Sequence, residues 1–281
     1  AVNAMKAAPK AVKAAPKAVK AAPKKIKTNP HCNKPLTTVH QCDRNTRTLQ
    51  RHATCWMHST TLMVYKSMFD LVQDDALKKW MQSMIHQQKG FKGSPIVENR
   101  TTKIHACPLM PQVLRDSMRR NTALKDKTFE RGGNPTRWLL ALMRAASIDF
   151  VVHKRTHDLT IQPKIMAFGS GEGAEKVVVF DLKLRGNTRK DVLGLMQVVN
   201  KMACKVDGKS VQFVGGILRV KFRASTGHAV AIFPCGESFI VCNTHGKACT
   251  ELGDKKKAAK KFGAGFEEYV NGFIPIFRVV T

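Results

Sequence analysis

Helical patterns fill the first half of this chain and strand-like patterns the second, and this order limits the folds that it can adopt. Apolar residues recur at three- and four-residue steps from Met57 to Val72, which predicts a helix with Cys55 at or near its first turn. Further helices are expected over 74–90 and 136–147. Short apolar runs predict strands at 148–153, 177–184, 211–222, 228–233, 238–242 and 272–280. An α+β fold, in which a helical part packs on a sheet, is the expected result.

The first 30 residues have a different character, because they form a lysine-rich repeat. Residues 4–24 read Ala-Met-Lys-Ala-Ala-Pro-Lys and then Ala-Val-Lys-Ala-Ala-Pro-Lys twice. The repeated proline excludes a coiled coil, since each one costs about 3 kcal/mol in a helix interior. We expect residues 1–30 to be a disordered basic tail that either contacts nucleic acid without sequence preference or only aids solubility or targeting. Residues 31–281 are expected to form one domain with an insertion near 91–130.

The charge of the chain favours a polyanionic neighbour. Its 48 Lys and Arg residues against 20 Asp and Glu give a formal net charge of +28. Residues 1–27 hold eight lysines and no acid, so +20 of this charge lies on the rest of the chain. Nucleic acid is the first candidate for such a partner, ahead of an anionic membrane surface or an acidic substrate.

Cysteine usage bears on the compartment. The eight cysteines are irregularly spaced and no signal-peptide pattern opens the chain, so we expect reduced, structural thiols at Cys235, Cys242 and Cys249. The protein is therefore expected to be intracellular, nuclear or virion-associated and not secreted. Cys32, Cys42 and the histidines around them lack the paired spacing of a zinc site. We expect no metal, no cofactor and, since no apolar stretch approaches ~18 residues, no membrane partner.

Three residues in the chain have the types and the setting that thiol catalysis requires. Cys55 precedes a helical pattern, and free amides at a helix start, like a nearby imidazolium, depress the pKa of a thiol. His228 begins one strand of an expected hairpin, and Asn243 follows the other strand, where its amide can orient the imidazole ring. A single cysteine or histidine is more often structural, so it is the three residues together that favour catalysis.

Five segments resemble, in the same order, motifs of the papain family of cysteine peptidases. They are Cys55-Trp56-Met57-His58-Ser59 (Cys-Trp-Ala-Phe-Ser in the family), Gly132-Gly133-Asn134-Pro135 (Gly-Gly-Tyr-Pro), His228-Ala229-Val230-Ala231 (His-Ala-Val-Ala), Asn243-Thr244-His245-Gly246 (Asn-Ser-Trp-Gly) and Asn271-Gly272-Phe273-Ile274-Pro275-Ile276 (Asn-Gly-Tyr-Ile-Arg-Ile). Residues 54–59 are also similar to the Thr-Cys-Tyr-Met-Asn-Ser box of ubiquitin-specific proteases, whose Gly-His pair recurs at Gly227-His228.

The resemblance implies a two-lobed fold in which Cys55 heads a central helix and His228 and Asn243 lie on an antiparallel sheet lobe. It implies hydrolysis of peptide or isopeptide bonds, with Cys55 as the nucleophile, His228 as the base and Asn243 as the orienting residue. Gln50 stands one place nearer the nucleophile than the family's oxyanion glutamine, and we carry that role to it. The expected substrate-binding residues are Trp56, Gly132, Gly133 and Gly227. His58 is expected on the surface.

The alternative is a basic nucleic-acid-binding or virion-associated protein that keeps the fold without the activity. Salt distinguishes the two functions, because non-specific nucleic-acid binding weakens steeply as salt rises and the reactivity of a thiol does not.

Overall fold

The structure is a computed structural model that describes most of the chain after residue 40. The described residues are 41–50, 52–86, 100–156, 177–184, 192–202, 210–222, 226–236, 238–244, 249–252 and 270–280. The expected basic tail at 1–30 and residues 91–99 of the expected insertion lie outside these ranges.

The helical part runs from residue 55 to residue 145. It consists of α1 (Cys55–Met68), η1 (Phe69–Leu71), α2 (Asp75–Met84), η2 (Ile104–Ala106), α3 (Gln112–Arg119) and α4 (Pro135–Ala145). Side-chain caps fix two of the starts: Asp74 accepts a hydrogen bond from the amide of Leu77 at 2.6 Å, and Asn134 accepts one from the amide of Thr136 at 2.9 Å. Pro135, which lacks an N–H, suits the first position of α4.

Among the described residues, seven strands form one mixed sheet. They are β3 (Phe150–Thr156), β4 (Val177–Lys183), β5 (Ser210–Phe222), β6 (Thr226–Cys235), β7 (Ser238–Cys242), β8 (Thr250–Leu252) and β9 (Val270–Val280), in the spatial order β3-β4-β9-β5-β6-β7-β8. β3 and β4 pair in parallel and every other pair is antiparallel. The expectation of a wholly antiparallel sheet is therefore wrong at this edge, where β3 and β4 run in the same direction. Separately, β1 (Arg47–Thr48) pairs with β2 (Ile85–His86).

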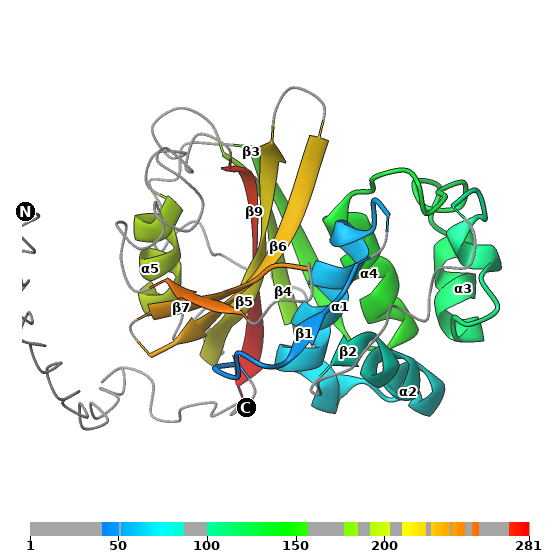
Figure 1. Ribbon diagram of the computed structural model, residues 1–281. Helices are drawn as coiled ribbons and strands as arrows, with labels where there is room; N and C mark the ends of the chain where they lie inside the picture. Colours follow the sequence, from blue (N-terminus) through cyan, green and yellow to red (C-terminus); the bar gives the residue numbers. More distant parts are fainter. Residues whose placement is uncertain are drawn as a thin grey trace, which may run out of the picture.

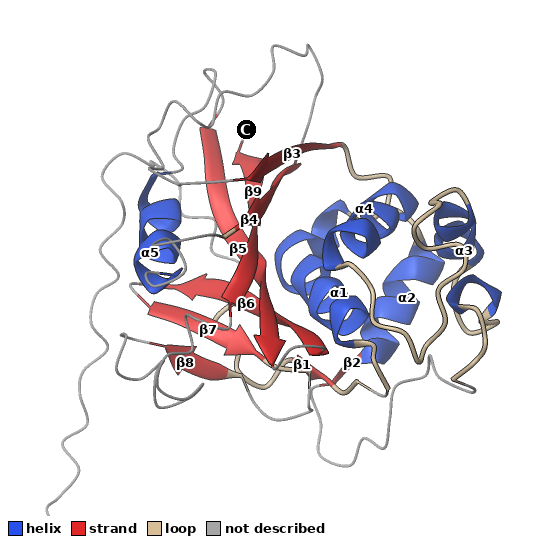
Figure 2. Cartoon of the chain, turned by 90° about the horizontal axis from the view of Figure 1, so that it is seen from above, coloured by secondary structure: helices blue, strands red, loops and turns tan. Residues whose placement is uncertain are grey.

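The sheet separates two hydrophobic cores. One face packs against α1 and α4, with α2 and α3 further out, and the other face packs against α5 (Val192–Met202), as Figures 1 and 2 show. α1 is enclosed between the sheet and α4, and 13 of its residues are buried. A helix buried on nearly all sides is the central element of its layer. These observations confirm the expected α+β class.

Two local expectations are corrected. The helix expected over 74–90 ends at Met84, because residues 85 and 86 turn into the short strand β2. Within the expected insertion, α3 packs against α4 and the hydroxyl of Ser117 donates to the carbonyl of Ala141 at 2.8 Å. The described part of this insertion therefore belongs to the main core.

The expectation of reduced cysteines is also wrong. Disulfides join Cys42 to Cys235, 193 positions apart, and Cys242 to Cys249. The irregular spacing hid these pairs because residues distant in the sequence meet only in the folded chain. Their presence removes the argument for a reducing compartment. No helix in the described part of the chain is long and apolar enough to cross a membrane.

Candidate active site

Cys55 is the first residue of α1 and is a free thiol. Only 7% of its surface is exposed. The first turn of the helix contains no acidic residue, and the Thr54 side chain makes no capping bond to it. The positive end of the helix therefore acts on the Cys55 sulfur without an opposing carboxylate.

A tight turn positions this helix start. His52 has a left-handed backbone (φ 58°), a conformation that non-glycine residues adopt mainly where the surrounding structure demands it. The indole Nε1 of Trp56 donates back to the carbonyl of Ala53 at 2.8 Å and closes the turn. Trp56 itself is 1% exposed. Its ring packs edge-on against Trp138 of α4, so it supports the site from within.

The strand that carries His228 is joined to α1 by the residue after it. The backbone N–H of Ala229 hydrogen-bonds to the sulfur of Cys55, and the hydroxyl of Ser59 donates to the carbonyl of Ala229 at 2.6 Å. Burial raises the pKa of the Cys55 thiol above its ordinary value, although the amides of Ala229, Trp56 and Cys55 act in the opposite direction. The Cys55 thiol is thereby held against the strand that carries His228.

His228 and Asn243 are in direct contact. The imidazole Nε2 of His228 lies 2.9 Å from Oδ1 of Asn243. Because an amide oxygen only accepts hydrogen bonds, Nε2 carries the hydrogen in this pair, and Nδ1 is the nitrogen able to take a proton. β6 and β7 pair up to Ala231 and Cys242, which places Asn243 immediately beyond the end of the ladder. The Cys242–Cys249 disulfide fixes the residue before it.

Gln50 lies beside the same asparagine. Its backbone N–H donates to the carbonyl of Thr244 at 2.7 Å, and the hydroxyl of Thr244 donates to Oε1 of its side chain. The Nε2 of Gln50 is thereby turned toward the start of α1, where it donates to the carbonyl of His52 at 3.4 Å. Thr244 and Ser59 connect the expected residues, and sequence reasoning did not single them out.

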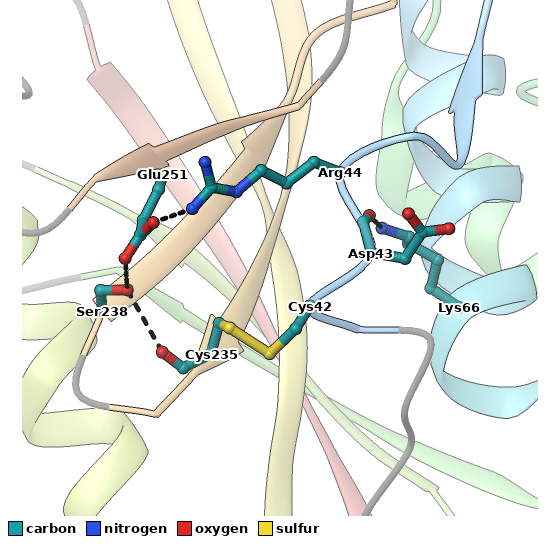
Figure 3. Close-up of a disulfide and its surroundings, with 7 residues drawn as sticks. All are labelled: Cys42, Asp43, Arg44, Lys66, Cys235, Ser238 and Glu251. Atoms are coloured by element: carbon teal, nitrogen blue, oxygen red, sulfur yellow. Dashed lines mark hydrogen bonds and ion pairs between the residues drawn. A yellow bond between two sulfur atoms is a disulfide. The ribbon is translucent and has the colours of Figure 1, made fainter. Parts of the chain in front are cut away.

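Residues 41–50, the leader segment, are anchored to the sheet edge before the chain enters α1. Figure 3 shows the Cys42–Cys235 disulfide and the ion pair of Arg44 with Glu251, whose other oxygen accepts from Ser238 at 2.9 Å. Nearby, the amine of Lys66 from α1 donates to the carbonyl of Asp43 and lies 5.0 Å from the ring centre of Phe233. Burial lowers the pKa of this lysine to about 8. These contacts tie α1, the leader segment and β6 together.

The pair of glycines, Gly132 and Gly133, lies against α1. A Cβ on Gly133 would stand 2.5 Å from the ring of Trp56, so only glycine fits there, whereas a Cβ on Gly132 meets nothing within 4 Å. The exposed backbone of Gly132 is thus held next to the residue that follows Cys55. Gly227 is also exposed and directly precedes His228.

His58 corrects another expectation, because it is buried rather than on the surface. Its exposed fraction is 0%, and neither ring nitrogen has a hydrogen-bond partner among the described residues. Complete burial lowers its pKa to about 3, so the imidazole is neutral in the folded protein. The helical pattern alone could not reveal this, since α1 is enclosed on nearly every side.

Within the described residues, no group of three or more His, Cys, Asp or Glu side chains is arranged to hold a metal ion. No protein-family model and no curated protein sequence matches the chain.

Solved structures are similar to the chain. The MERS coronavirus papain-like protease is 7% identical, with 85% of this chain and 69% of that chain covered at a TM-score of 0.40. The Saccharomyces cerevisiae Pan2 pseudoubiquitin hydrolase–RNA exonuclease module, solved with AAGGA RNA, is 10% identical, with 89% and 57% covered at 0.46. The Pseudomonas avirulence protein AvrPphB is 15% identical, with 83% and 96% covered at 0.31. The first two of these structures bear the names of the two groups of proteins that the sequence motifs resemble, papain-like proteases and ubiquitin hydrolases.

Proposed function

We propose that this protein is a cysteine peptidase that hydrolyses peptide or isopeptide bonds through Cys55, His228 and Asn243. The observation that carries the proposal is the 2.9 Å contact between His228 and Asn243, on a strand whose next residue, Ala229, bonds to the sulfur of Cys55. The helical layer and the sheet would act as two lobes, with the substrate chain lying across the start of α1.

Acylation follows from this geometry. Cys55 transfers its proton to Nδ1 of His228 as its sulfur attacks the carbonyl carbon, and Nε2–H of the ring stays bonded to Asn243. Burial raises the pKa of the thiol, so the sulfur needs His228 to take its proton before it can attack as a thiolate. The backbone N–H of Cys55 and Nε2 of Gln50 stabilise the tetrahedral oxyanion. The carbon–nitrogen bond then breaks, and His228 returns its proton to the leaving amine.

Deacylation uses the same groups in reverse. His228 takes a proton from water, the oxygen attacks the thioester, and the carbon–sulfur bond breaks to release the acid product and the Cys55 thiol. Gly132 and Gly133 would present backbone groups to the substrate chain. Gly227 leaves space beside the imidazole, and Trp56 acts by supporting Gly133 from below the surface.

Hydrolysis of fluorescent casein tests the proposal. The wild-type protein is expected to release fluorescence, Cys55→Ala to lose activity completely, and Asn243→Ala to lose at least about tenfold in kcat/KM because the imidazole is no longer oriented. Cys107→Ala is the matched control, since Cys107 is the other cysteine among the described residues that is buried and outside the disulfides. Activity that survives in Cys55→Ala would refute the assignment.

A basic nucleic-acid-binding or virion-associated role without catalysis is the second candidate, and the net charge of +28 favours it. In that case the Lys-rich residues 1–30 would carry the phosphate contacts and the protein would be intracellular, nuclear or packaged in a virion. Such a role places no demand on Cys55, so binding to a DNA oligonucleotide would be the same in wild type and in Cys55→Ala.

A further inference from the structure

We propose that the substrates of this site are peptide segments with acidic residues flanking the scissile bond. The inference rests on the proposed peptidase function and adds the substrate class to it. Its basis is a set of three cations, Lys127, Arg131 and Lys221, that lie beside the glycines proposed to line the substrate site.

Two of these cations belong to the glycine segment. The amine of Lys127 donates to the carbonyl of Gly132 at 3.3 Å, and the exposed Arg131 immediately precedes that glycine. Gly133, the next residue, touches the ring of Trp56 beside Cys55. Two positive charges thus stand at the backbone along which the substrate is proposed to lie.

The third cation belongs to the sheet that carries His228. Lys221 of β5 is exposed and pairs directly with Gly227 of β6, the residue before His228. Because side chains alternate along a strand, Lys221 projects from the same face of β5 as Ile217, which is packed in the core that contains α1. A substrate that crosses the start of α1 would meet positive charge before and after the scissile bond.

Acidic residues of the described chain are largely engaged elsewhere. Ion pairs join Arg44 to Glu251, Lys78 to Asp75, Lys103 to Asp126, Arg119 to Asp116, Arg219 to Asp181 and Arg278 to Asp70, and none of those found among the described residues involves Lys127, Arg131 or Lys221. Between Lys127 and Gly133 the sequence holds one acidic residue, Glu130, which is exposed. The three cations therefore create a net positive potential that an acidic chain can neutralise.

Nucleic acid fits this arrangement less well than an acidic peptide. Proteins that bind single strands combine a basic groove with aromatic side chains on which bases stack. All three tryptophans, Trp56, Trp80 and Trp138, are buried, so none of them offers a stacking surface.

A proteome-derived peptide library made with trypsin tests the proposal, because its peptides retain Asp and Glu. After digestion by the wild-type protein, mass spectrometry is expected to show Asp or Glu enriched at least about threefold beside the cleaved bonds. Arg131→Glu and Lys221→Glu should each reduce this enrichment toward the library frequency and reduce cleavage of acidic peptides by about fivefold or more. Raising salt from 50 to 500 mM should weaken the wild-type preference, since exposed charges are screened.

Arg144→Glu is the matched control. Arg144 is exposed on the last turn of α4, about 15 Å along the helix from Asn134, and the substitution changes the net charge equally. It should leave the enrichment unchanged. The proposal is overturned if Asp and Glu are equally enriched beside the bonds cleaved by all variants, or are not enriched with the wild type. It is also overturned if Arg131→Glu and Lys221→Glu lose DNA binding while their peptide preference stays unchanged.

An uncharged vinyl sulfone separates failure of this proposal from failure of the peptidase function. If Cys55 reacts with the probe and the library stays uncut, the activated thiol stands and the acidic-peptide assignment is refuted. If Cys55 does not react, the proposed peptidase function fails and this assignment fails with it.

Discussion

Removing the Cys42–Cys235 disulfide is expected to cost far more stability than removing the Cys242–Cys249 disulfide. A cross-link stabilises mainly by restricting the unfolded chain, and the effect grows with the logarithm of the loop that it closes. The two sequence separations are 193 and 7. In the chain-entropy treatment they correspond to about 5 kcal/mol and about 2 kcal/mol at 25 °C.

Guanidinium denaturation of two double variants measures this difference. In Cys42→Ala/Cys235→Ala the first cysteine is exposed and the second half-buried, so little packing is lost with the cross-link. In Cys242→Ala/Cys249→Ala both cysteines are buried, and the small cavities add to the loss. Loss of packing therefore adds to the cost of removing the short-loop disulfide. We still expect the larger loss of unfolding free energy in the variant that lacks the long-loop disulfide.

Two results would refute this reasoning. One is an equal or greater loss of unfolding free energy in the short-loop variant. The other is alkylation of Cys42 or Cys235 in the denatured, unreduced wild-type protein, which would mean that the bond is absent.

Three other perturbations test separate parts of the account. The pKa of His58 falls from 6.5 to about 3 on burial, so protonation favours the unfolded chain and stability is lost as the pH falls from 6.5 toward 3. His58→Leu should remove this loss, which amounts to about 3 kcal/mol at pH 4. Denaturant titrations at pH 7 and pH 4 measure it, and an equal loss of stability in wild type and His58→Leu would contradict the prediction. Gly133→Ala should lower the free energy of unfolding by about 1–3 kcal/mol because its Cβ overlaps Trp56, whereas Gly132→Ala should change it little, and equal effects would count against the packing described. Because burial raises the pKa of the Cys55 thiol, its alkylation by iodoacetamide should keep rising with pH through the ordinary thiol range, and a plateau reached by pH 6 would show a preformed thiolate.

The fold class and the meeting of His228 with Asn243 could be predicted because local patterns determine both. Apolar runs give the two strands, and their closeness in the sequence favours pairing as a hairpin. An imidazole and an amide at matching ends of the hairpin then approach each other. The start of α1 at Cys55 could be read in the same way, since apolar residues recur from Met57 onward.

The remaining features depend on tertiary contacts that no local pattern carries. The Cys42–Cys235 bond forms because the leader segment lies beside β6, which the sequence does not indicate. The sequence likewise does not indicate the strand order, in which β4 lies between β3 and β9. The burial of His58 needs α4 and the sheet to enclose α1. The sequence gives the net charge of the chain but not where the charges lie. Only the fold shows that Lys221 lies opposite Gly227, the residue before His228.

Active-site labelling tests the central claim most directly. The protein is treated at neutral pH with a peptidyl epoxide, and intact mass is compared for wild type, Cys55→Ala, His228→Ala and the control Cys107→Ala. The account predicts a single adduct in the wild type and in Cys107→Ala, and none in Cys55→Ala or His228→Ala. An adduct that persists in His228→Ala at the wild-type rate, or no adduct in the wild type, would contradict it.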